Sequence, residues 1–282
     1  MAPPLTAVLA ALLSYRTHIS SLNHRAFSAV VPEVEAAVPE DPDLFESDEE
    51  LEEARFEYIL GLVGGVVDTR PPITRPSDVL THWDVLAPQL ALDGASVYHD
   101  ASWRDQMRDA YMRGVLRGLN ERCPDLATTW EFPADLADVL QHVDSLQGPG
   151  WYKYRDEHES VIFFEGWVHD GGPGDLVENV AAGRVRTAGE IIGKTVGIGE
   201  DYEIAGGWAC GEKGNEASCY VVYGRRRDAG EDRGWSWRYV ACLGQFGTLV
   251  FENVAELLEW YKSYGEPQED DWSVSAEEVF QA

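Results

Sequence analysis

Residues 235–264 constrain the fold of this chain more than any other stretch. Their sequence, WSWRYVACLGQFGTLVFENVAELLEWYKSY, predicts two strands joined by a short glycine-containing turn and followed by an amphipathic helix. The expected buried positions are Trp235, Trp237 and Tyr239 on the first strand and Val254, Leu257, Leu258 and Tyr261 on the helix. Because the stretch carries no obvious catalytic constellation, it indicates a folded module whose aromatic and apolar side chains serve packing.

The composition indicates a folded protein with a strongly acidic surface. Of the 282 residues, 44% are hydrophobic, which is enough for one large core or two ordinary ones. The formal net charge is −28, from 50 acidic and 22 basic residues. Such a surface repels phosphate backbones and anionic lipids, so we expect neither nucleic acid nor a membrane as partner. The charge favours either plain solubility or a dedicated basic protein partner.

The N-terminal residues do not predict a secretory signal. Residues 5–13 are apolar, but the first basic residue is Arg16, whereas a signal peptide carries its positive charge before the apolar stretch. No apolar run approaches the roughly 20 residues that span a bilayer. We therefore expect the protein in the cytoplasm or the nucleus.

Residues 1–122 are predicted to be mainly helical, with acidic and proline-rich linkers at 32–46 and 69–77. Ser47 begins a capping-box sequence and so predicts the start of a helix. Two further helices are expected near 78–91 and 102–121. The second of these carries a basic stripe, formed by Arg104, Arg108, Arg113 and Arg117. The stripe is either an ordinary solvated face or a site for an acidic partner or the acidic linker.

Residues 128–266 are predicted to form an α+β domain with flanking helices, and residues 267–282 a loose acidic tail. A first helix is expected after Pro133, since proline is tolerated in a first helical turn. The expected strands are 161–167, 194–198, 219–223, 237–242 and 248–251. Residues 219–223 are apolar on both faces, which is typical of a central strand.

Motifs for chemistry are weak throughout the sequence. Residues 189–195 imitate a phosphate-binding loop, but the spacing between their glycines is one residue short and a strand is expected next. The histidines show no spacing typical of a metal site, so we expect no metal and no cofactor. The cysteines are expected to be small core residues, although Cys210 and Cys219 are alternatively close enough in sequence to pair across a loop.

Taken in order, several segments of the second half resemble the SUKH superfamily, which includes the fungal cell-wall-synthesis regulator family and many bacterial toxin-immunity proteins. Phe132-Pro-Ala-Asp135-Leu136 and the turn at 148–150 resemble the family's Leu-Pro-x-[DE] helix and Asn-Gly-Gly turn. The remaining segments are 196–201, 219–223 and 250–258, which resemble the strand with its acidic turn, the next strand and the closing strand-to-helix step.

The resemblance covers residues 130–265, about half of the chain. Phe132 replaces the usual leucine, the turn lacks asparagine, and residues 203–207 replace a usual Gly-Asp pair. What the resemblance implies is an α+β domain with a mixed sheet that binds other proteins without catalysis. For the fungal branch, it implies a role in cell-wall or stress signalling.

We therefore expect a non-enzymatic interaction or regulatory protein, without catalytic residues, whose partners are other proteins. Large aromatic side chains beside glycine-rich turns, and a basic run in a long loop, mark the expected partner surface. Its predicted residues are Trp151, Tyr152, Trp208, Arg225, Arg226 and Arg227. The aromatic members are expected to be exposed.

Two alternative functions stay open. A hydrolase of a small substrate would use Asp156, Glu165 and Asp201, and it predicts a deep cavity with converging carboxylates of shifted pKa. An immunity-type inhibitor would use the acidic surface to neutralise a basic toxin, and it predicts strongly salt-dependent association.

Overall fold

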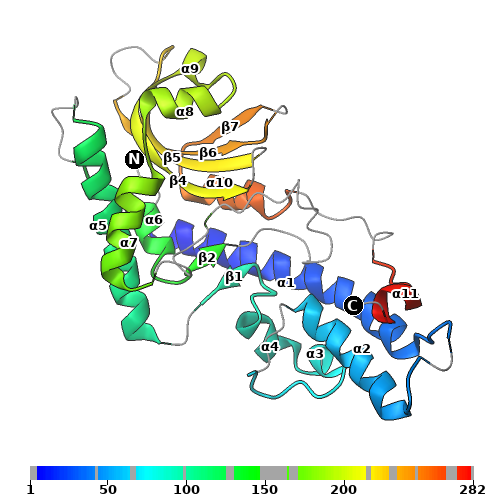
Figure 1. Cartoon of the computed structure of the whole chain (residues 1–282). Coiled ribbons are helices and arrows are strands. Elements are labelled where there is room, and N and C mark those ends of the chain that lie inside the picture. Colours follow the sequence, from blue (N-terminus) through cyan, green and yellow to red (C-terminus); the bar gives the residue numbers. More distant parts are fainter. Residues whose placement is uncertain are drawn as a thin grey trace.

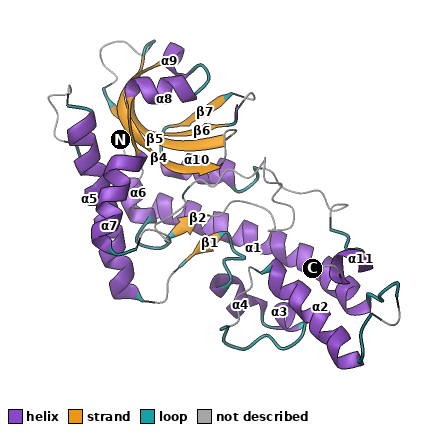
Figure 2. Ribbon diagram, in the orientation of Figure 1, coloured by secondary structure: helices purple, strands orange, loops and turns teal. Residues whose placement is uncertain are grey.

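An antiparallel sheet with helices on both faces lies beside a helical body in this α+β protein (Figures 1 and 2), so the predicted fold class is confirmed. The computed structural model describes residues 5–41, 44–63, 68–97, 100–124, 130–146, 164, 171–213, 217–228, 234–244, 247–264 and 272–280.

The N-terminal part is mainly helical, as predicted. Its helices are α1 (Leu5–Ala36), α2 (Asp48–Leu62), α3 (Asp78–Thr81), α4 (Trp83–Gln89) and α5 (Ala101–Arg122). Ser47 caps α2 by accepting a hydrogen bond from the Glu50 backbone N–H at 3.2 Å. The linker predicted from residue 32 is wrong at its start, because α1 continues past Pro32. Burial of Val30, Val31 and Val34 holds this last part of the helix in place.

The C-terminal part contains a five-stranded sheet. In chain order its elements are α6 (Ala134–Val139), α7 (Pro173–Asn179), the π-helical turn η2 (Val180–Arg184), β3 (Val185–Thr187), α8 (Ala188–Lys194), α9 (Ile198–Asp201), β4 (Tyr202–Lys213), β5 (Ala217–Arg226), β6 (Ser236–Cys242), β7 (Thr248–Phe251), α10 (Val254–Tyr261) and α11 (Ala276–Phe280). A separate two-stranded pair joins β1 (Ala95–Ser96) to β2 (Ser145–Leu146).

Each strand of the large sheet pairs with its sequence neighbour, in the order β3-β4-β5-β6-β7. All of these pairs are antiparallel, so the mixed sheet that we expected is wrong. Strand β5 is central, as its two apolar faces predicted. The predicted strand at 194–198 is also wrong, because α8 ends at Lys194 and α9 begins at Ile198. Residues 189–194 are therefore helical and do not form a phosphate-binding loop.

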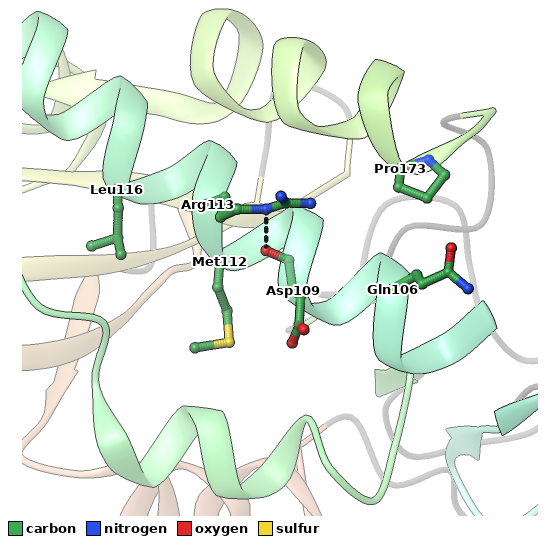
Figure 3. Close-up of a pocket in the computed structure, with 6 residues that line it drawn as sticks. All are labelled: Gln106, Asp109, Met112, Arg113, Leu116 and Pro173. Carbon is green, nitrogen blue, oxygen red and sulfur yellow. Dashed lines mark hydrogen bonds between the residues drawn. The ribbon is translucent and has the colours of Figure 1, made fainter. Parts of the chain in front are cut away.

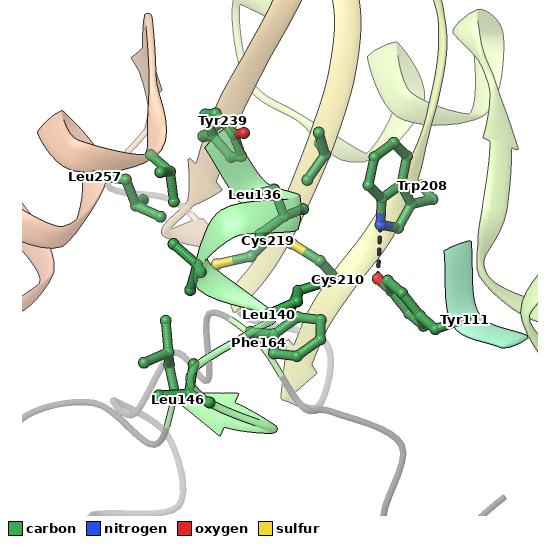
Figure 4. Packing of buried hydrophobic residues seen from close by; sticks show 14 of the residues in the cluster. Tyr111, Leu136, Leu140, Leu146, Phe164, Trp208, Cys210, Cys219, Tyr239 and Leu257 are labelled. Carbon is green, nitrogen blue, oxygen red and sulfur yellow. Dashed lines mark hydrogen bonds between the residues drawn. The ribbon is translucent and has the colours of Figure 1, made fainter. Parts of the chain in front are cut away.

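The two faces of the sheet bury different clusters. Helices α1, α5, α6, α7 and α10 pack on one face, and we call their shared cluster the sheet core (Figure 4). Helices α8 and α9 cover the other face, where Ile191 and Ile198 meet Tyr220, Val222 and Val240. The residues of the opening sequence behave only in part as predicted: Tyr239 and the four apolar residues of α10 are buried, whereas Trp235 and Trp237 are half-buried.

A second cluster, here called the helical core, lies away from the sheet. It joins the C-terminal half of α1 to α2, α3 and α4, and Phe27, Ile59 and Leu86 are fully buried in it. The N-terminal half of α1 belongs to the sheet core, where Tyr15 stacks on Tyr261 with ring centroids 5.7 Å apart. A boundary near residue 122 therefore does not separate two cores, because α1 takes part in both.

The C-terminal tail is not loose over its described residues. Trp272 and Val279 are buried in the helical core, and α11 packs beside α2 (Figure 1). The loose tail was predicted from its acidic composition, and that prediction gave no weight to these two apolar residues.

Candidate functional site

Trp208 is not an exposed anchor, which corrects the sequence prediction. It lies in the middle of β4, is fully buried in the sheet core, and donates a hydrogen bond from Nε1 to the Tyr111 hydroxyl at 2.8 Å (Figure 4). The neighbouring glycines suggested a turn, but they serve close packing. A Cβ atom at Gly207 would lie 2.2 Å from the Val221 carbonyl oxygen, and one at Gly206 would lie 2.6 Å from Cys123 Sγ.

The three predicted arginines lie at the end of β5 and contact other parts of the chain. Arg225 pairs with Glu203 at 2.7 Å and stacks over Trp235. Arg226 pairs with Asp228 at 3.0 Å. Arg227 donates a hydrogen bond to the Gly199 carbonyl oxygen at 2.9 Å. Arg225 and Arg227 thus attach the end of β5 to Trp235, which directly precedes β6, and to α9.

The remaining predicted residues do not assemble into a site within the described chain. Trp151, Tyr152, Asp156 and Glu165 lie outside the described residues, and Asp201 is exposed at the end of α9. Among the described carboxylates, burial raises the pKa of Asp93, partly offset by its ion pair with Arg16. Through its ion pair with Arg16, Asp93 anchors α1. This helix packs on the face of the sheet opposite to α9, where Asp201 lies. The residues described contain no group of three or more metal-ligating side chains.

Asp135 has a structural role that the sequence did not reveal. It is the acidic position of the Leu-Pro-x-[DE] resemblance, and it is buried beneath the sheet. Its carboxylate accepts hydrogen bonds from the Tyr239 hydroxyl at 2.6 Å and from the Val254 backbone N–H at 3.0 Å. Burial raises the pKa of Tyr239 well above its usual value, and the neighbouring carboxylate adds to the effect. Asp135 thus joins α6 to β6 and to the start of α10.

The basic stripe on α5 is largely neutralised by acids of the same chain. Arg104 pairs with the buried Asp144 at 2.9 Å, Arg108 pairs with Asp105 at 3.0 Å, and Arg117 pairs with Glu121 at 2.8 Å. None of these partners belongs to the acidic linker at 32–46. The stripe thus holds the chain together and leaves little positive surface for an acidic partner.

An open groove runs along α5 beside the start of α7. It has a volume of about 470 Å³ and is lined by Gln106, Asp109, Met112, Arg113, Leu116 and Pro173. Within it, Arg113 Nε donates a hydrogen bond to the Asp109 carbonyl oxygen at 3.3 Å (Figure 3). Only one acidic side chain, Asp109, lines the groove among the described residues, so they do not provide the paired carboxylates that hydrolysis of a small substrate would need.

A row of acids without partners among the described residues lies on the surface of α2. This helix carries six acidic residues and one arginine, and it lies at the end of the molecule away from the sheet (Figure 1). Glu49, Glu53 and Glu57 follow one another at i, i+4 spacing, are exposed, and form no hydrogen bond or ion pair with any described residue. We call these three residues the acidic row. The i, i+4 spacing in the sequence was a signal that could have identified it.

The acidic row suits a cationic ligand. Three carboxylates spaced by one helical turn can receive lysine or arginine side chains of an approaching protein. Arg55, the one basic residue of α2, is buried and pairs with Glu52, so it does not neutralise the row.

Comparison with known proteins gives no match: no family model, no curated protein and no solved structure is significantly similar to this chain. Every helix in the described part of the chain is too short or too polar to cross a lipid bilayer.

Proposed function

We propose that the protein is a non-enzymatic regulator that acts by binding a basic protein. One observation carries the proposal: the arginines of the described surface pair largely within the chain, whereas the acidic row stays unpaired. A net charge of −28 adds a long-range field that accelerates encounter with a cationic partner and opposes nucleic acid. The SUKH resemblance of residues 130–265 agrees with a binding role in the cytoplasm or nucleus, including cell-wall signalling or toxin neutralisation.

Affinity purification at two salt concentrations tests this function. The full chain, immobilised, is exposed to cell extract at about 50 mM and about 500 mM NaCl, since salt screens charges more strongly at the higher concentration. We expect the captured proteins, identified by mass spectrometry, to be basic and to be released at high salt. Capture that does not depend on salt would contradict a charge-driven partner.

A pair of charge variants locates the binding surface. The first carries Glu49→Gln, Glu53→Gln and Glu57→Gln. The matched control carries Asp84→Asn, Glu131→Gln and Glu200→Gln, three exposed acids in separate parts of the chain whose side chains also form no hydrogen bond or ion pair with a described residue. Both variants change the net charge by the same amount. We expect the first to lose the captured partner and the control to retain it; equal losses would assign binding to net charge and remove the acidic row from the proposal.

A further inference from the structure

The two edges of the large sheet differ in how they are closed. At the β3 edge, helix α5 lies along the strand, and the Arg122 guanidinium donates a hydrogen bond to the Val185 carbonyl oxygen. Cys123 Sγ lies 3.7 Å from the Arg186 carbonyl oxygen as a second donor. A Cβ atom at Gly118 would lie only 2.6 Å from Val185 Cγ2, which shows how closely the helix covers this edge.

The β7 edge has no such cover among the described residues. The Leu243 N–H donates to the Gly247 carbonyl oxygen at 2.9 Å, which fixes the alternation of the β6–β7 ladder. Leu249 and Phe251 therefore direct their backbone groups toward β6, while Thr248 and Val250 direct theirs away from the sheet. Within the described chain, nothing forms a hydrogen bond with these outward N–H and C=O groups.

Exposed apolar side chains border this edge, and its strand, although only four residues long, carries no protecting proline or charge. Residues 247–251 contain neither proline nor charge. Leu249 is 39% exposed. Cys242, which lies opposite Thr248, donates from Sγ to the Lys194 carbonyl oxygen at 3.4 Å, so the end of α8 lies over this part of the sheet. Near that end of α8, Ile192 and Val196 are also exposed, by 39% and 59%.

We propose that the β7 edge binds an extended segment of a basic protein, which adds a sixth strand to the sheet. Backbone hydrogen bonds to Thr248 and Val250 would hold the segment, and its apolar side chains would cover Leu249 and Val196. The basic character of the segment rests on the proposed function. A second copy of this chain is a poorer occupant, because it would bring a further charge of −28 to the interface.

Hydrogen exchange with a defined probe tests the edge directly. The probe is the peptide acetyl-(Lys-Val)4-amide, and acetyl-(Lys-Pro)4-amide is its control, since it has equal charge but cannot form a strand. In the free, full-length protein, NMR should show fast exchange of the Thr248 and Val250 amides and slow exchange of the Leu249 and Phe251 amides. Addition of the lysine–valine peptide should slow the first pair.

Two substitutions at position 250 distinguish the contribution of the backbone N–H to peptide binding from that of the side chain. Val250→Pro removes the outward backbone N–H. Val250→Ala shortens the side chain but keeps that N–H. We expect V250P to weaken binding of the lysine–valine peptide about tenfold and V250A to leave it nearly unchanged. If the Leu249 and Phe251 amides exchange fast in V250P, the substitution has disrupted β7 itself. The pair Thr248→Pro and Thr248→Ala is then used in place of V250P and V250A.

The other outcomes each overturn the proposal. Equal binding of both peptides, unaffected by V250P, would assign binding to charge alone and leave the proposed function standing. Binding of neither peptide at low salt would contradict the proposed function as well. A dimer in analytical ultracentrifugation that V250P abolishes would make a second copy the occupant of the edge.

Discussion

Single buried residues connect elements that the sequence alone did not bring together. Asp135 accepts hydrogen bonds from a strand hydroxyl and from the first backbone N–H of α10, and so determines where the closing helix sits on the sheet. The four buried cysteines form no disulfide, and burial raises the pKa of Cys219 well above its usual value. The Cys210–Cys219 pairing that the sequence left open is not formed.

Substitution of Asp135 should destabilise the fold. Asp135→Ala leaves the Tyr239 hydroxyl and the Val254 N–H buried without an acceptor, which costs about 2–4 kcal/mol of unfolding free energy. Urea denaturation followed by tryptophan fluorescence measures the change. The control is Asp138→Ala in the same helix, whose side chain is half-buried and has no described partner; it should change stability by less than about 0.5 kcal/mol. Equal effects would show that Asp135 is not a connecting residue.

Among the elements, α5 packs against α7 and η2 through a pair of glycines one turn apart. A Cβ atom at Gly114 would lie 2.9 Å from the Val177 carbonyl oxygen, and one at Gly118 would lie 2.8 Å from the Ala181 carbonyl oxygen. Because these obstacles are backbone atoms, they can move aside only if the whole element shifts. The close approach of the helices therefore depends on the missing side chains.

Alanine at position 118 should separate these elements. We expect Gly118→Ala to lower the unfolding free energy by about 1–3 kcal/mol through overpacking. Gly61→Ala in α2 is the matched control, since a Cβ atom there meets nothing within 4 Å; it should stabilise the protein by about 0.5–1 kcal/mol. Thermal and urea denaturation measure both changes. A stabilising G118A would contradict the tight contact.

The cap of α8 should weaken in acid. The Glu190 carboxylate accepts hydrogen bonds from the Thr187 N–H at 2.7 Å and the Thr187 hydroxyl at 2.8 Å, and these lower its pKa below 4.5. Its stabilising contribution is therefore complete above the unfolded-state pKa and is lost as pH falls through the lower folded-state value. An NMR titration of the Glu190 side chain should give this lowered pKa. A Glu190 pKa at or above the ordinary value of a glutamate side chain would contradict the cap.

The elements that the sequence predicted correctly are those with a regular apolar pattern. Helix α10 repeats clearly because it buries one face, while β6 and β7 are short aromatic and apolar runs, and the last five residues of β6 are buried. Strand β4 was missed because Gly206 and Gly207 look like a turn, while their purpose, close approach to Cys123 and to β5, depends on distant residues. The same mistaken turn led to the wrong prediction that Trp208 is exposed. The negative charge of the candidate site could be predicted from the sequence. Which acidic side chains stay unpaired could not, because that depends on tertiary contacts.

At the scale of the whole molecule, α1 links the sheet core to the helical core. Tyr15 is fully buried in the N-terminal half of this helix and Phe27 in the C-terminal half. Each core is completed by C-terminal elements, α10 in one and α11 in the other. The two cores therefore share one continuous element, and we expect them to unfold together.

Hydrogen exchange on a single substitution tests this coupling. Phe27→Ala removes a fully buried ring from the helical core and should cost about 3–5 kcal/mol. If α1 couples the cores, exchange of the Val221 amide in β5 should accelerate as much as exchange of the Ile59 amide in α2. Leu13→Ala, at a position of α1 that is 67% exposed, is the control and should change neither. Acceleration of Ile59 alone would show that the cores are independent.

The contact between α1 and α10 also bears on how the protein is made. Ser14 and Lys262, which are hydrogen bonded at 3.3 Å, lie 248 positions apart in the sequence. At a synthesis rate of about 5–20 residues per second, α1 waits on the order of 10 to 50 seconds for its final partner. During that time Tyr15 and its apolar neighbours are exposed on the nascent chain. We expect the protein to depend on chaperones during translation, although the finished fold is held by ordinary packing.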